Sequence, residues 1–190
     1  MGNASGRAKA KPLVIKAAPG DGSGTYHVEI SEEPDVHLVS LTKEGFPDAY
    51  YLPWRSGGFT ECEISLSKGQ IGYFFTAALS GCSIWYKFEE KKLKVRHEAR
   101  PGEDAHWEHT IAGFKMVFDS HPSTECTLVI DEKTLVRTAQ FFMVYALIDH
   151  AEKVVEFRIQ LIKHVRNGNT QAETYELIRD TPCPAPFPKG

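Results

Sequence analysis

The fold is decided by the stretch AQFFMVYALIDHAEKVVEFRIQLIKHV, residues 139–165. It contains two long apolar runs, 139–148 and 155–165, and a polar break at residues 149–153 separates them. In the second run apolar and polar side chains alternate, which is the period of a strand with one buried face. Two such runs joined by a short polar segment predict an antiparallel hairpin.

Shorter segments with strand patterning occupy most of the remaining chain. We predict strands over residues 26–30, 36–41, 62–66, 83–89, 93–97, 114–118 and 126–130. Helical patterning is rarer, because only residues 170–178 form a clear candidate helix and residues 71–78 fit a helix and a strand equally well. The pattern therefore predicts an α+β fold, a β-rich sandwich of mixed sheets with a few peripheral helices.

The two ends of the chain differ in composition from its middle. Residues 1–24 are rich in Gly, Ala and Lys, and we interpret them as a flexible N-terminal leader. The alternating prolines of residues 181–190 exclude a helix and predict an extended Pro-rich tail. Residues 25–180 remain as a single catalytic domain, which is long enough to bury a core.

Composition excludes several classes of protein. The apolar fraction of 42% and the charged fraction of 25% are those of an ordinary globular chain. The net charge of −3 argues against a direct nucleic-acid partner, since phosphate binding needs a basic face. No apolar run is long enough for a transmembrane helix, so no membrane partner is expected. The four cysteines show no CxxC motif and no disulfide-framework spacing, which favours reduced thiols.

The run Leu79-Ser80-Gly81-Cys82 is the best candidate for a reactive site. A cysteine nucleophile needs a neighbouring base or a lowered pKa, and it needs N–H groups that face the developing oxyanion. Ser80-Gly81 permits a tight bend just before a predicted strand. Such a bend is expected to turn the backbone amides of Cys82 and Ser83 outward as an oxyanion site.

A partner for this thiol is found in the next strand. The chain has eight histidines, and His97 is the first of them after Cys82. If strands 83–89 and 93–97 form a hairpin centred on residue 91, His97 pairs with Trp85, three residues from Cys82. This arrangement predicts a Cys82–His97 pair. The alternative is an inert Cys82, because a lone cysteine in a β-protein is usually a small buried hydrophobe.

Further histidines lie in the run His106-Trp107-Glu108-His109. Neither an HExxH motif nor a cysteine pair accompanies them, so we predict a polar loop and no metal site. His106 and His109 remain the other candidates for the base. Trp107, with the aromatic side chains Trp54, Phe59 and Trp85, is a candidate for a docking surface, although at least half of these four are expected in the core.

The four-residue run ending at Cys82 matches the Leu-Ser-Gly-Cys motif of bacterial glutamine deamidase toxins, and over its central third the chain resembles that family. The family includes the Burkholderia lethal factor and the catalytic domain of cytotoxic necrotizing factor. The resemblance implies that Cys82 is the nucleophile and a downstream histidine its partner. The 15-residue step to His97 matches the necrotizing factor, whereas the lethal factor's shorter step would fall on Lys94. Thr76, six residues before Cys82, matches a lethal-factor Thr that orients the histidine.

The resemblance implies a protein-glutamine deamidase that works through a thioester on Cys82 and needs no metal and no organic cofactor. The implied partner is a host protein. The RNA helicase of translation initiation is favoured by chain size, so translation inhibition is expected, and a Rho-family GTPase is the alternative. The protein is then a bacterial product, expected to be a monomer, that acts in the host-cell cytoplasm, although no secretion signal is visible. A cysteine protease, a transglutaminase and a β-sandwich binding module are the competing interpretations.

Overall fold

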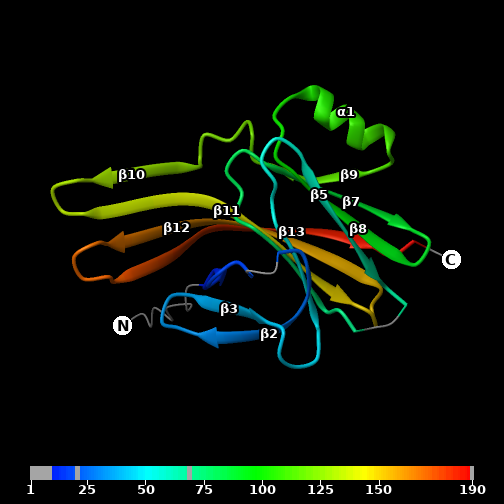
Figure 1. Cartoon of the computed structure of the whole chain (residues 1–190), viewed down its shortest axis with the longest axis horizontal. Coiled ribbons are helices and arrows are strands. Elements are labelled where there is room, and N and C mark those ends of the chain that lie inside the picture. Colours follow the sequence, from blue (N-terminus) through cyan, green and yellow to red (C-terminus); the bar gives the residue numbers. More distant parts are fainter. Residues whose placement is uncertain (1–9, 20–21, 68–69, 189–190) are drawn as a thin grey trace, which may run out of the picture.

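The computed structural model describes residues 10–19, 22–67 and 70–188. Within these residues the chain is a β-rich sandwich of two sheets, and α1 (Glu103–Ile111) is its sole helix. The helix lies at the margin of the molecule beside β9 (Figure 1). No helix in the described part of the chain has the length and apolar character needed to cross a membrane. The strands are β1 (Leu13–Ile15), β2 (Gly24–Glu32), β3 (His37–Thr42), β4 (Ala49–Leu52), β5 (Phe59–Ser65), β6 (Tyr73–Thr76), β7 (Ser83–Glu89), β8 (Lys92–Glu98), β9 (Lys115–Asp119), β10 (Thr127–Asp131), β11 (Val136–Asp149), β12 (Val154–Asn167) and β13 (Glu173–Pro186).

The larger sheet is built around the predicted hairpin. In the described residues its order is β1-β3-β2-β4-β6-β11-β12-β13, and β10 adds to β11. The β11–β12 pairing is continuous from Val136↔Asn167 to Asp149↔Val154, which confirms the hairpin expected from residues 139–165. The β1–β3 and β4–β6 pairs are parallel and the other pairs are antiparallel, so this sheet is mixed. The smaller sheet has the antiparallel order β5-β8-β7-β9.

The main core lies between the two sheets. The larger sheet contributes the buried side chains Phe142 and Phe157, and the smaller sheet contributes Ile84 and Val95. Alternate side chains of a strand share a face, so His97 in β8 lies on the same inward face as Val95. The sandwich therefore directs a histidine into the space between the sheets.

The C-terminal segment departs from the predictions. Residues 170–178 were expected to form a helix and residues 181–190 a separate tail, but β13 runs through both and pairs along β12. Pro182, Pro184 and Pro186 recur with the period of a strand, and β13 is the edge of its sheet. A proline lacks the N–H that a ladder needs, and a period of two keeps every missing donor on one side, the open edge.

Three other predictions change in a similar way. Residues 13–15 of the expected flexible leader form β1 and pair with β3, whereas residues 1–9 and 20–21 lie outside the described part of the chain. The ambiguous segment 71–78 contains a strand, β6. Residues 106–109 belong to α1 and not to a polar loop.

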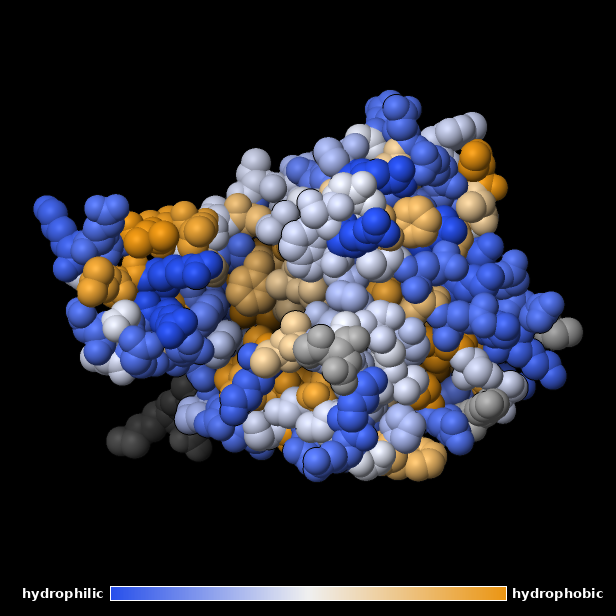
Figure 2. Space-filling view, viewed as in Figure 1, coloured by the Kyte–Doolittle hydropathy of each residue, from blue (hydrophilic) through white to orange (hydrophobic). Residues whose placement is uncertain are grey.

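The surface carries both aromatic and aliphatic exposed groups. Of the four aromatic candidates for a docking surface, Trp54, Phe59 and Trp107 are exposed and Trp85 is buried in the small sheet. The prediction that at least half of the four pack in the core is therefore wrong, because only Trp85 does. Figure 2 shows a separate apolar patch over β10, whose side chains are exposed along its whole length.

Candidate active site

The Leu79–Cys82 motif forms a bend that is anchored at both ends. Leu79 is fully buried and exchanges two backbone hydrogen bonds with Phe142, with N···O distances of 2.8 and 3.1 Å. Ser80 is exposed, and Gly81 has a φ of 90°, a conformation that favours glycine. Apart from Gly81 and its two neighbours in the chain, no described atom lies within 4 Å of the point where a Cβ on Gly81 would sit, so the bend is open on that side.

Ser120, just after β9, holds the far end of the bend. Its Oγ accepts hydrogen bonds from the backbone N–H groups of Gly81 and Cys82 at 3.0 and 2.9 Å, and it donates to the Cys82 carbonyl at 2.7 Å. In this state the Cys82 amide, which was predicted to hold an oxyanion, is occupied by Ser120 Oγ. Ser83 lies inside β7 with a strand on each side, and its hydroxyl accepts a bond from Trp85 Nε1. Sequence reasoning missed Ser120 because 38 residues separate it from Cys82.

We expect Ser120→Ala to lower the free energy of unfolding by about 2 kcal/mol, because the buried N–H of Cys82 and the partly buried N–H of Gly81 lose the hydroxyl that accepts from them. Urea denaturation with an unchanged m-value measures this loss. The exposed Ser80 in the same bend provides the matched control, and Ser80→Ala is expected to change stability little. Equal effects of the two substitutions would contradict the clamp.

The pairing of β7 with β8 differs by one residue from the predicted register, and this difference sets the face on which His97 lies. The β7–β8 turn has Glu90 and Lys91 at its centre, with a φ of 54° at Glu90, so His97 pairs with Ile84 and not with Trp85. Cys82 precedes Ile84 by two residues, and both belong to the inter-sheet core. The two-residue turn therefore places His97 on the same face as Cys82, whereas pairing with Trp85 would have turned it to the other face.

Thr76 fixes the orientation of this histidine. Its Oγ1 donates to the Leu52 carbonyl at 2.8 Å and lies 2.6 Å from His97 Nδ1. Because the hydroxyl proton is used on Leu52, the neutral ring must donate its Nδ1–H to Thr76. The proton-free Nε2 is then a base, and this atom is buried with no hydrogen-bond partner among the described residues. The predicted contact between Thr76 and His97 is present and joins the two sheets.

Burial keeps both candidate groups uncharged. It lowers the pKa of His97 from 6.5 to about 4, with a smaller opposing effect from the charge of Glu98. Burial also raises the pKa of the Cys82 thiol, and the charges of Glu98 and Asp119 raise it further against a hydrogen bond from the Ser80 backbone. The Cys82 thiol and the His97 imidazole are therefore both uncharged at neutral pH.

The lowered pKa of His97 predicts a loss of stability in mild acid. Between pH 6.5 and about 4 the unfolded chain binds a proton at His97 that the folded chain does not, so stability falls as pH falls through this window. The full contribution is about 3 kcal/mol, from a shift of roughly two to three pKa units. Urea denaturation from pH 7 to 4 measures it, and His97→Gln should flatten that part of the profile. If His97→Gln had the same pH dependence of stability as the wild type, a buried and neutral His97 would be contradicted.

His109 is excluded as the base by its own hydrogen bonds. Its Nε2 lies 2.9 Å from the buried Glu98 carboxylate, and its Nδ1 accepts from Arg96 at 3.1 Å. Burial alone would raise the pKa of Glu98, but hydrogen bonds from Arg100 and His109 outweigh it and hold that pKa below its usual value. Both ring nitrogens of His109 are thus occupied by hydrogen bonds, one with Arg96 and one with Glu98.

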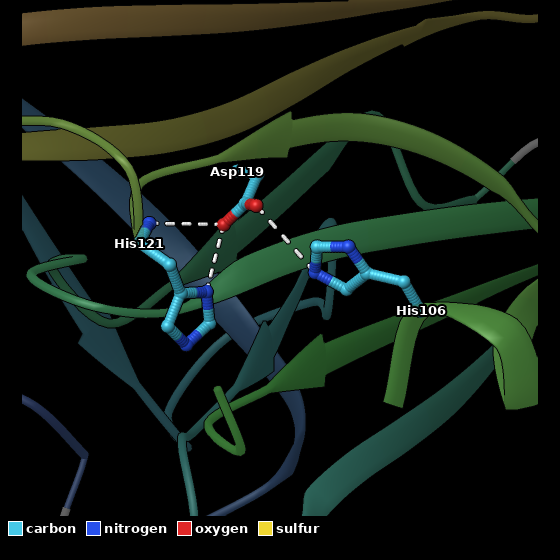
Figure 3. Close-up of side chains that lie close together, drawn as sticks. All are labelled: His106, Asp119 and His121. Atoms are coloured by element: carbon cyan, nitrogen blue, oxygen red, sulfur yellow. Dashed lines mark hydrogen bonds and ion pairs between the residues drawn. The ribbon is translucent and has the colours of Figure 1, made fainter. Parts of the chain in front are cut away.

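His106, the other alternative base, faces a carboxylate. Its Nε2 lies 3.5 Å from Asp119 Oδ2, and His121 Nδ1 lies 2.7 Å from Oδ1 of the same carboxylate (Figure 3). Sequence reasoning named His106 but missed Asp119 and His121, which come from a different segment.

No protein-family model and no curated protein matches this chain. The site is therefore interpreted from its own geometry and from the motif around Cys82. All four cysteines are free thiols, as their spacing predicted. Of them, Cys82 alone lies in the bend that Ser120 clamps.

Proposed function

We propose that this protein is a glutamine deamidase that acts on a host protein, with Cys82 as nucleophile, His97 as base and Thr76 as the residue that orients His97. The hydrogen bond between Thr76 and His97 supports this proposal most directly. This bond places the only N–H of the neutral His97 ring at Nδ1. The lone pair of Nε2 is then free on the face that His97 shares with Cys82.

The reaction follows from these groups. His97 Nε2 takes the Cys82 proton, and the sulfur attacks the carboxamide carbon of a substrate glutamine. The C–N bond then breaks, His97 returns the proton to the departing nitrogen, and ammonia leaves a thioester on Cys82. A water that gives its proton to His97 cleaves the thioester, which releases glutamate and restores the thiol. No metal or organic cofactor enters these steps.

The resting geometry implies that substrate binding starts the reaction. Cys82 and His97 are both neutral and buried, and no hydrogen bond joins His97 Nε2 to the thiol in the described structure. A substrate carboxamide that enters beside the open Gly81 would be held against the bend. Its oxyanion would take the place of Ser120 Oγ on the amides of Gly81 and Cys82, since these two donors already converge on one oxygen.

A neutral side chain suits this entrance. Glutamine carries no charge, so its side chain loses little solvation free energy when it enters. The resting thiol is neutral, so it attracts no charged side chain to the site. The exposed aromatic groups Trp54, Phe59 and Trp107 are candidates to contact the protein that carries the glutamine. Of the two targets that the motif suggests, we favour the RNA helicase of translation initiation and keep the Rho-family GTPases as the alternative.

Intact-mass analysis tests the proposal. The purified protein is incubated with the helicase and, separately, with a Rho-family GTPase, and each product is weighed and its peptides sequenced. A gain of about one mass unit at a single glutamine, with release of ammonia, is the expected result. Cleaved products would instead indicate a protease, cross-linked products a transglutaminase, and unchanged substrates that remain bound a binding module.

A further inference from the structure

Beside the Cys82 bend, three side chains from two segments converge on one point. His106 comes from α1, Asp119 from the end of β9 and His121 from the turn that follows. One candidate ligand atom from each lies within 4.8 Å of the others. Figure 3 shows the two imidazole rings turning nitrogens toward the Asp119 carboxylate from two sides. We propose that His106, Asp119 and His121 form a binding site for a divalent transition-metal ion of the zinc class.

The spacing fits such an ion. Zinc bonds of about 2.0–2.2 Å hold neighbouring tetrahedral ligand atoms about 3.3–3.6 Å apart. His106 Nε2 and Asp119 Oδ2 already lie 3.5 Å apart, which is long for a hydrogen bond and near this separation. His106 Nε2 is buried with no hydrogen-bond partner among the described residues, and an unpaired buried nitrogen is costly. A metal ion between the two atoms would satisfy both.

The third ligand needs a small rearrangement. His121 Nδ1 now shares a hydrogen bond of 2.7 Å with Asp119 Oδ1, and the backbone N–H of His121 donates to the same oxygen at 2.9 Å. On metal binding the neutral ring carries its proton on Nε2, so Nδ1 can bond the ion. The backbone bond keeps the carboxylate in place while the side chains close on the metal.

Ligand chemistry and access select the kind of ion. Two imidazoles with one carboxylate suit zinc and its neighbours, whereas magnesium and calcium prefer oxygen ligands alone. The side chains of His106, Asp119 and His121 are 29%, 13% and 16% exposed, so the site lies close beneath the surface. A water that enters with the ion would complete the coordination. The metal proposal does not rest on the deamidase proposal, because its ligands do not include Cys82, His97 or Thr76. The one link between them is the charge of Asp119, which raises the pKa of the Cys82 thiol.

The site would also tie down the nucleophile bend. Ser120, whose hydroxyl clamps Gly81 and Cys82, stands between Asp119 and His121 in the sequence. A metal that bonds both neighbours would restrict the backbone that carries this hydroxyl. An ion that binds only the folded state stabilises it by an amount that grows with the logarithm of the ion concentration, so a rise in Tm is a second readout besides affinity.

Isothermal titration of the full chain with Zn²⁺, and with Co²⁺ as a coloured substitute, tests the site. We expect one ion per chain, and each of His106→Gln, Asp119→Asn and His121→Asn should weaken binding about tenfold or more. The matched control is His164→Gln: His164 Nε2 is also buried and unpaired in the described structure and lies 3.6 Å from a Glu173 carboxylate oxygen, but it has no second histidine beside it. This control should bind like the wild type.

The Co²⁺ spectrum separates this site from the thiols. Imidazole and carboxylate ligands give visible bands without the near-ultraviolet sulfur charge-transfer band that a cysteine ligand adds, and Cys82→Ser should leave the spectrum unchanged. Magnesium in excess should not compete. The proposal is overturned if no binding occurs at millimolar Zn²⁺, if the three substitutions bind as tightly as the wild type, or if binding disappears with a cysteine instead. Circular dichroism of each variant excludes unfolding as the cause of a loss.

Discussion

Replacing Cys82 by serine is expected to reduce deamidation by at least about a thousandfold while the fold remains intact. Serine is nearly isosteric with cysteine, so it leaves neither a cavity nor a clash at the buried Cys82 position. The serine hydroxyl, however, is a far weaker nucleophile next to a neutral imidazole. Initial rates of ammonia release, together with the mass of the substrate, measure the loss.

Cys183→Ser provides the control for this substitution. Cys183 is a half-buried thiol on β13, within the same core but away from the bend. Its replacement should leave the rate within about twofold, since surface or edge changes away from a site have small effects. Retention of a tenth or more of the activity in Cys82→Ser would rule out Cys82 as the nucleophile.

The second large effect concerns His97 and the residue that orients it. His97→Gln should lower kcat by about 10²–10⁴-fold, the usual contribution of a general base. Thr76→Val keeps the shape of Thr76 but removes the acceptor for His97 Nδ1–H, so the ring can change tautomer and turn. We expect a kcat loss of roughly tenfold or more with little change in KM. Steady-state kinetics on the deamidated substrate measure both parameters.

Thr76→Ser is the conservative partner of this test. It retains a hydroxyl that can donate to the Leu52 carbonyl and accept from His97, so it should recover most of the activity lost in Thr76→Val. A purely structural role for Thr76 would lower stability in both variants and leave kcat unchanged in the folded fraction. Equal kcat values for the valine and serine variants would contradict the orienting role.

These two predictions use residues that the sequence alone had named. The Leu-Ser-Gly-Cys run indicated Cys82, the distance along the chain indicated His97, and Thr76 followed from the resemblance. Strand patterning also predicted most of the β-strands and the β11–β12 hairpin, because alternation of apolar side chains is a local property that each strand carries by itself. The open bend at Gly81 was likewise visible in the residue types.

Local sequence patterns gave wrong predictions where the neighbouring strand decided the secondary structure of a segment. Residues 170–178 were predicted to be a helix, but residues 173–178 pair along β12 at the edge of a large sheet and form a strand. The same edge accommodated the alternating prolines that had indicated a detached tail. The register of β7 and β8 was set by a turn of two residues, which no composition rule distinguishes from one of three.

The sequence by itself determined the strand pattern, the bend and the identity of the candidate reactive groups, because each depends on neighbours a few positions away. The tertiary structure decided which groups meet. It brought Ser120 to the amides of Gly81 and Cys82, turned His97 inward onto Thr76, and gathered His106 with Asp119 and His121. These contacts join residues 13–39 positions apart. They depend on strand register and sheet packing, and a one-residue change of register reverses the face of every side chain.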